Sequence, residues 1–504
     1  LEHAVGDVLL EPPAAGHVLL AVLGLLGTVF WPLPPPPPES PVSVFGSRRY
    51  LLIWIAVPLL AALAIPYWLQ DRHLAYIWPA LYALVACGLL LLKRWGRVAY
   101  AAGLALLLVT SGWALYLERT DVDFEFGRIM AAIEDRALSD DLVIMSQEAF
   151  WPFEEYYARR GLRVEYVPSD EHSLDGRYLR PWLDEVTAEH SRIWLGPVSA
   201  WTADPHHIVE RWLAWRAFQA FKEWWPGSGA SALYFTAPEL DALPLHQTVD
   251  WEGRVRLRGL QVWPPRQEDN GGLPAVAVGD ALRIAFTWLP GELPDLPHVV
   301  GLYLVDAGGM VWAERRSEPC SGQCPTRDWE ASTDVEDHHA LLIPPGTPPG
   351  RYTVEVGWTS PDEGRELELD GWGTRAPLLE IMVVRPEEGS EAARADSCVQ
   401  YSLRASFGDE VVLTGYELQP DPVPAKGNLQ LDLFWQVVAQ PPGSRRLLVE
   451  LVGPGERVAA SWNRAPVSSL FPAADWKVGD YLRSMQRLAI PHDVEPGRYR
   501  LRLR

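Results

Sequence analysis

Four apolar runs within the first 117 residues constrain the fold of this chain more than any other feature. They cover residues 14–33, 50–69, 74–92 and 98–117. Each is close to the ~20 residues that a helix needs to cross the hydrocarbon core of a bilayer. Loops rich in Lys and Arg mark the cytoplasmic side, which places Arg48-Arg49 and Lys93–Arg97 inside. The pattern therefore predicts a multi-pass cell-membrane protein whose large region after residue 117 is extracytoplasmic.

The charge distribution narrows the choice of partners. The chain has a net charge of −21, and residues 118–504 alone carry −22, because residues 1–117 carry +1. Binding to a nucleic-acid backbone needs clustered Lys and Arg, which this acidic region lacks. We therefore expect no nucleic-acid partner.

Residues 118–245 alternate between short apolar strands and amphipathic helices. The expected strands are Asp141–Met145, Arg163–Val167, Arg192–Leu195 and Ala232–Thr236. Such alternation is typical of a small α/β domain with a mainly parallel sheet. The turns after these strands contain no glycine-rich phosphate-binding motif, so we interpret the domain as structural and expect no nucleotide cofactor.

Two copies of one β-rich unit follow, over residues 246–386 and 397–504. Matching segments recur in the same order: Arg256–Leu260 with Val412–Tyr416, Leu282–Trp288 with Leu429–Trp435, Val299–Val305 with Arg446–Val452, Asp328-Trp329 with Asp475-Trp476, and Pro349–Tyr352 with Pro496–Tyr499. Alternating strands between Gly/Pro turns indicate antiparallel β-sandwiches. The matched Trp288 and Trp435 are expected to fill cores. The chain starts at Leu1 and stops within a predicted strand, so we expect a fragment with a truncated second sandwich.

The cysteines leave two readings open. Cys320 and Cys324 flank Ser-Gly-Gln in a predicted loop, where they either form a short disulfide or stay as two thiols. An extracytoplasmic position favours the disulfide. Cys87 falls in a predicted span, and Cys398 has no evident partner.

Two polar groups are candidates for a site. Arg72 and His73 occupy a short outer turn, where they could bind a lipid phosphate through charge-assisted hydrogen bonds. The alternative is an interfacial Arg that binds nothing specific. The second group is dense in possible metal ligands: Asp334, Glu336, Asp337, His338 and His339. Its spacing matches no defined metal site, and the second copy lacks most of it, so we interpret it as a solvated connection and expect no metal.

Arg72, followed by Trp78-Pro79-Ala80-Leu81, resembles the R-Y-x-x-x-x-x-P segment of GT-C-type glycosyltransferases. These polyprenyl-phosphate-sugar-dependent enzymes are related to protein mannosyltransferases and lipid A aminoarabinose transferases. The order of late spans, small α/β domain and paired sandwiches is also similar to that of bacterial members. His73 stands where the family has Tyr. The family's catalytic Asp lies in a first extracytoplasmic loop that this chain does not contain, so no catalytic residue is assigned.

The resemblance implies the C-terminal part of a membrane glycosyltransferase. Its partners would be a polyprenyl-phosphate sugar donor, membrane lipid and an unidentified extracytoplasmic acceptor, and a carboxylate would activate the acceptor hydroxyl. Whether this chain is itself enzymatic stays open. The alternative is a non-catalytic, membrane-anchored glycan-binding or scaffold protein built from β-sandwich modules.

Overall fold

The computed structural model describes most of the chain beyond residue 135 and a short stretch before it. The described residues are 92–93, 96–109, 112, 133, 136–146, 162–168, 176–196, 204, 206–225, 229–245, 248–291, 297–369, 373–387, 399–420 and 427–504. The chain divides into two compact units, Leu1–Gly127 and Arg128–Arg504. Every described strand belongs to the second unit.

The predicted α-helical membrane spans are the first point of correction. Residues 97–109 are helical. Nowhere in the described ranges is a helix both long and apolar enough to cross a membrane. The predicted spans 14–33, 50–69 and nearly all of 74–92 lie outside the described residues. The fold class of a multi-pass α-helical membrane protein is therefore wrong for the described chain, which is mainly strand, and the predicted cell-membrane localisation is corrected with it.

Three parallel strands open the second unit. Strand β1 (Leu142–Ser146) lies between β2 (Arg163–Val167) and β3 (Arg192–Leu195). The side chains of Leu142, Val143 and Ile144 are all fully buried. A strand covered on both faces is typical of parallel sheets, and this explains the unbroken apolar run in the sequence.

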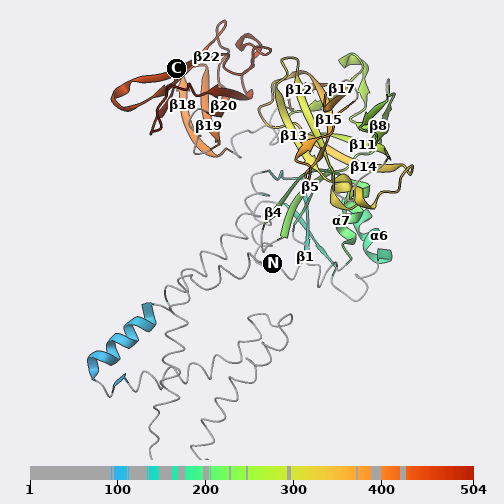
Figure 1. The fold of residues 1–504 in the computed structure, drawn as a ribbon, viewed down its shortest axis with the longest axis horizontal. Coiled ribbons are helices and arrows are strands. Elements are labelled where there is room, and N and C mark those ends of the chain that lie inside the picture. Colours follow the sequence, from blue (N-terminus) through green and yellow to red (C-terminus); the bar gives the residue numbers. More distant parts are fainter. Residues whose placement is uncertain are drawn as a thin grey trace, which may run out of the picture. The chain divides into compact units, whose positions relative to one another are not determined.

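Two helices and an antiparallel pair complete this part. Helix α6 spans Gly176–Thr187 and α7 spans Ile208–Arg216. Strands β4 (Phe218–Trp225) and β5 (Gly229–Phe235) pair antiparallel, and β5 also pairs antiparallel with β3. The sheet is therefore mixed, because its parallel strands continue into an antiparallel pair (Figure 1).

One sheet runs from this α/β part into the first β-sandwich. Its order is β2-β1-β3-β5-β4-β14-β11-β8-β6, and the join is a parallel pair of Gln219 on β4 with His339 on β14. A side-chain hydrogen bond also links the α/β part to the first sandwich: the Arg192 guanidinium donates to the carbonyl of Gly279 at 3.3 Å.

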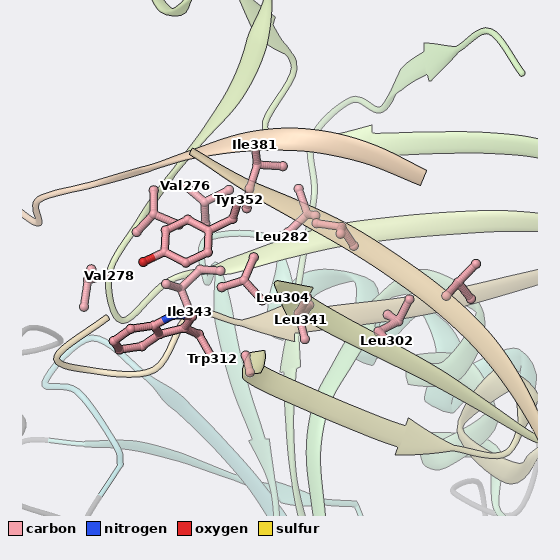
Figure 2. Packing of buried hydrophobic residues seen from close by; sticks show 14 of the residues in the cluster. Val276, Val278, Leu282, Leu302, Leu304, Trp312, Leu341, Ile343, Tyr352 and Ile381 are labelled. Carbon is pink, nitrogen blue, oxygen red and sulfur yellow. The ribbon is translucent and has the colours of Figure 1, made fainter. Parts of the chain in front are cut away.

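The first sandwich contains the strands β6 (Asp241–Leu243), β7 (Val249–Trp251), β8 (Val255–Trp263), β9 (Arg266–Gln267), β10 (Leu273–Ala277), β11 (Ala281–Pro290), β12 (Val299–Asp306), β13 (Val311–Ser317), β14 (Val335–Leu342), β15 (Gly350–Ser360), β16 (Arg365–Glu366) and β17 (Arg375–Val384). Its second sheet has the order β13-β12-β15-β17-β10-β9. Figure 2 shows the packing between the sheets, where Trp312 meets Tyr352 edge to face at a centroid distance of 6.4 Å.

The second sandwich contains β18 (Tyr401–Phe407), β19 (Val411–Gln419), β20 (Asn428–Val437), β21 (Leu447–Val452), β22 (Val458–Arg464), β23 (Tyr481–Ala489) and β24 (Arg500–Leu503). Its sheets have the orders β18-β19-β20-β23 and β22-β21-β24.

Strand pairing confirms the internal repeat. Strands β8-β11-β14 correspond to β19-β20-β23, and β13-β12-β15 correspond to β22-β21-β24. The registers agree as well: Trp288 faces Leu257, and its counterpart Trp435 faces Leu413. Both Trp side chains are buried, at 0% and 3% exposure, which confirms their expected role in the cores.

Candidate functional site

The predicted phosphate-binding pair, Arg72 and His73, lies outside the described residues. It therefore stays a prediction. The other polar group of the sequence, Asp334–His339, is described and can be examined directly.

This second group is not the solvated connection that we expected. Residues Val335–Leu342 form β14, a strand paired with β11 on one side and β4 on the other. Alternation along a strand sends successive side chains to opposite faces. Asp337 and His339 consequently share one face and are buried, whereas the Glu336 side chain is 60% exposed. Within the described ranges, no three His, Cys, Asp or Glu side chains come together to hold a metal.

Asp337 is the centre of a buried polar network. Its carboxylate accepts hydrogen bonds from Trp288 Nε1 at 3.0 Å, the Cys320 backbone N–H at 2.7 Å and His339 Nε2 at 2.6 Å. Burial alone would raise the pKa of this carboxyl, but the His339 ring and the three donors hold the pKa below its ordinary value. Asp337 is thus a carboxylate whose charge is fully compensated by hydrogen bonds.

The partners of His339 identify its protonation state. Arg315 donates to Nδ1, so this nitrogen must carry a lone pair, and Nε2 donates its proton to Asp337. Burial lowers the pKa of His339, and the neighbouring Arg315 lowers it further. His339 is therefore a neutral ring held as a single tautomer between a cation and an anion.

The network continues into the α/β part. Arg315 donates to Gln219 Oε1 at 3.3 Å, and Gln219 Nε2 donates to the Tyr234 hydroxyl at 2.9 Å. Burial raises the pKa of Tyr234 and lowers that of Arg315 to about 10. Arg315 thus keeps its charge at neutral pH. The sequence signal for this link was a single Gln in the aromatic strand Phe218–Trp225, which we did not interpret.

The network cannot act as a catalytic Asp–His pair in this form. A general base has to reach a proton on a substrate. Asp337 and His339 are 1% and 0% exposed, and each of their polar atoms is already paired with a protein group. The arrangement stabilises the junction of the two parts.

The disulfide of this region is present. Cys320 and Cys324 are bridged, with their Cα atoms 5.4 Å apart, which confirms the first of the two readings. The bridge closes the loop that carries the Cys320 N–H donor of Asp337. It therefore fixes one donor of the buried carboxylate.

The second sandwich contains a cavity of about 390 Å³. Its apolar wall includes Phe407, Val411, Trp435, Leu447 and Trp476, and its charged rim includes Glu410, Arg445, Arg446 and Arg504. Arg445 and Arg446 are exposed, so the cavity opens to solvent at this rim. Arg445 pairs with Glu410 at 2.8 Å.

The first sandwich has a cluster of aromatic side chains at the equivalent position. There Trp358 packs edge to face against Trp288 and Trp329, at centroid distances of 5.1 and 5.9 Å. The counterparts of those two neighbours are Trp435 and Trp476, both in the cavity wall. Trp358 lies opposite Val300 in the strand register, and the counterpart of Val300 is Leu447, another wall residue. Trp358 itself has no counterpart within this sequence, because the register places that position directly after Arg504.

Trp435 adds an unsatisfied polar group. Its counterpart Trp288 donates to Asp337, but the residue that matches Asp337 in the strand register is Ser484. The buried Ser484 hydroxyl accepts from Gln486 at 2.7 Å. The Trp435 indole N–H has no hydrogen-bond partner among the described residues. The Trp435 N–H is therefore a buried donor without the partner that Trp288 has in the first sandwich.

No protein-family model matches this chain, and no curated protein matches it.

Proposed function

We propose that this chain is a non-catalytic binding protein whose second β-sandwich takes up a planar aromatic group. One observation carries the proposal: the second sandwich has an open cavity of about 390 Å³ whose wall includes the buried indoles of Trp435 and Trp476. Aromatic side chains prefer edge-to-face or offset-stacked aromatic neighbours, so this wall favours an aromatic ligand.

The contents of the described chain support binding rather than catalysis. Its buried Asp–His–Arg network is sealed, whereas the cavity has an apolar wall and a charged rim. An apolar concavity with few polar groups is the usual form of a ligand site. The two Trp side chains are each 3% exposed, so they form the sides of a slot and not an open platform for stacking a sugar ring.

The test is calorimetric titration of the purified chain with indole. We expect saturable binding, and about tenfold weaker binding for Trp476→Ala, because loss of an aromatic contact and its buried area costs on the order of 1–2 kcal/mol. Trp224→Ala is the matched control, since Trp224 is 68% exposed and lies outside the cavity wall. Absence of indole binding, or an equal loss of indole affinity in both variants, would rule out the cavity as a binding site.

The resemblance to sugar transferases stays a prediction. Its candidate residues, Arg72 and His73, lie outside the described residues, and nothing in the described part bears on transfer from a polyprenyl-phosphate sugar.

A further inference from the structure

We infer that the Cys320–Cys324 disulfide is a reversible redox switch: an external dithiol reduces it and thereby loosens the junction between the α/β part and the first sandwich. The switch consists of residues 319–325, called here the bridged loop, and the groups that this loop contacts in both parts. The inference is independent of the cavity in the second sandwich.

The bridged loop contacts both sides of the junction. On the side of the first sandwich, the Cys320 backbone N–H donates to Asp337 Oδ1 at 2.7 Å. On the side of the α/β part, Gln323 Nε2 donates to Glu210 Oε2 of α7 at 3.2 Å. A change in the conformation of this loop therefore acts on both parts at once.

The backbone of the bridged loop has a conformation that residues with a side chain rarely adopt. Cys320, Ser321 and Gly322 are consecutive and have φ values of 49°, 57° and 88°. The left-handed region is unfavourable for Cys and Ser because the Cβ atom crowds the backbone. Residues in this region persist only where their surroundings hold them, and they are common in switch regions. The disulfide is one of these constraints, so its reduction allows the loop to relax.

A buried hydroxyl group makes the bridged conformation less favourable still. The Ser321 side chain is 6% exposed, and its hydroxyl has no hydrogen-bond partner among the described residues. A buried polar group without a partner is unfavourable because it has lost its hydrogen bonds to water. Relaxation of the loop returns this hydroxyl to solvent, which favours the reduced state.

The disulfide is a small constraint compared with a bridge between distant strands. Its two cysteines are separated by 4 positions in the sequence. In the chain-entropy model, the stabilisation by a disulfide grows with the length of the closed loop, so a short loop contributes little. Reduction therefore changes the conformation of the bridged loop without unfolding the chain.

The two sulfur atoms differ in their access to solvent. Cys320 is 1% exposed, whereas Cys324 is half-buried, so the thiolate of a dithiol reaches Cys324 Sγ first. This thiolate forms a bond to Cys324 Sγ, the bond between the two cysteines breaks, and Cys320 leaves as a thiolate and takes up a proton. The reduced Cys320 has a hydrogen-bond acceptor in place, since the Glu336 carbonyl oxygen lies 3.4 Å from its sulfur.

The second thiol of the reductant completes the exchange. After losing its proton, it attacks the reductant sulfur that is bonded to Cys324, and Cys324 leaves as a thiolate and takes up a proton. Two electrons and two protons have then passed from the dithiol to the protein, and the dithiol is a disulfide. Reoxidation by the reverse steps closes the bridge again.

The experiment equilibrates the full chain, under native conditions, with mixtures of reduced and oxidised dithiothreitol. A Cys87→Ser/Cys398→Ser background leaves Cys320 and Cys324 as the only cysteines, and mass spectrometry after alkylation counts their thiols. We expect reversible formation of two thiols. Hydrogen–deuterium exchange of the same samples should become several-fold faster in α7 after reduction and stay unchanged in β20 of the second sandwich.

Two substitutions test the backbone argument in opposite directions. Ser321→Gly removes the left-handed side chain and its buried hydroxyl, so half-reduction should need an about tenfold higher ratio of reduced to oxidised dithiothreitol. Gly322→Ala adds a Cβ at a φ of +88° where nothing lies within 4 Å, so its effect is conformational. This variant should need a several-fold lower ratio. Equal ratios in both variants and the parent would overturn the inference.

The matched control is the variant Cys320→Ser/Cys324→Ser in the same background. Dithiothreitol should leave its exchange in α7 unchanged, because it has no bridge to reduce. A bridge that stays oxidised until the chain unfolds would overturn the inference. Reduction of the parent without faster exchange in α7 would do the same, since the bridge would then be confined to its own loop.

Discussion

The two β-sandwiches share a strand order but differ in what fills them. The first encloses a charged network around Asp337 and a cluster of four indoles, from Trp251, Trp288, Trp329 and Trp358. The second has Ser484 in place of Asp337, Phe407 edge to face with Trp435 at a centroid distance of 5.3 Å, and a cavity whose wall includes Trp435 and Trp476. A duplicated fold thus keeps its strand register while its interior diverges, because register depends on the alternation pattern and interior fillings do not.

The largest effect should come from removing the charge that distinguishes the first sandwich. Asp337→Ala leaves three buried donors unpaired beside Arg315, and breaking such a buried ionic group costs about 3–5 kcal/mol. Ser484→Ala, the matched change in the second sandwich, should cost about 1 kcal/mol, as for one neutral hydrogen bond. Chemical denaturation of both variants measures the difference. Equal losses would mean that the two networks are equivalent in energy.

The second prediction concerns a substitution that opens a cavity in the first sandwich. Trp358→Ala should cost about 3–5 kcal/mol of unfolding free energy, as expected for a fully buried aromatic residue. It should also create a second indole site, because the walls of Trp288 and Trp329 remain. Calorimetry would then give two indole sites per chain, and added indole would raise the unfolding temperature of the variant. A count that stays at one would show that the cavity collapses.

The disulfide offers a smaller effect that is confined to the first sandwich. Replacing Cys320 and Cys324 by Ser opens a loop of sequence separation 4. The chain-entropy relation assigns such a short loop about 2 kcal/mol. Part of the loss should disappear in an Asp337→Ala background, since the bridge positions one donor of that carboxylate. Simple addition of the two losses would show that the bridge and the carboxylate are independent.

The smallest expected effect depends on pH. Burial depresses the pKa of His339, so the unfolded chain binds more protons than the folded chain just below the unfolded histidine pKa of about 6.5. Stability should fall as the pH drops below this value, by at most about 1.4 kcal/mol per pH unit. His339→Gln copies Gln486 of the second sandwich and should flatten this region of the profile. The depressed pKa of Asp337 adds a separate loss only in the acid range, below about pH 4.

The sequence was informative wherever a pattern repeats. The paired segments predicted two similar sandwiches and the burial of Trp288 and Trp435, because matched apolar positions in alternating strands imply matched cores. The strands Arg163–Val167 and Arg192–Leu195 were predicted with their observed bounds. These features depend on local alternation, which a single sequence displays.

The sequence was misleading where polar residues are buried. The stretch from Asp334 to His339 looked like a solvated loop, since charged side chains rarely lie fully inside a protein without partners. Its partners, Arg315 and Trp288, come from distant strands, so the burial of Asp337 could not be predicted from its neighbours. The cavity was not predicted from the sequence for a related reason: its wall combines Phe407, Trp435 and Trp476, which come from three separate segments.

The join between β4 and β14 has a mechanical consequence. Because the sheet is continuous through Gln219 and His339, a pulling force on the α/β part would pass directly into the first sandwich through neighbouring strands. Among the described residues, β4 and β14 share one register pair, so the buried side chains on either side of it would bear much of the load. The hydrogen bond from Arg315 to Gln219 would then oppose the separation of the two parts, and its rupture would contribute to the force at which they separate.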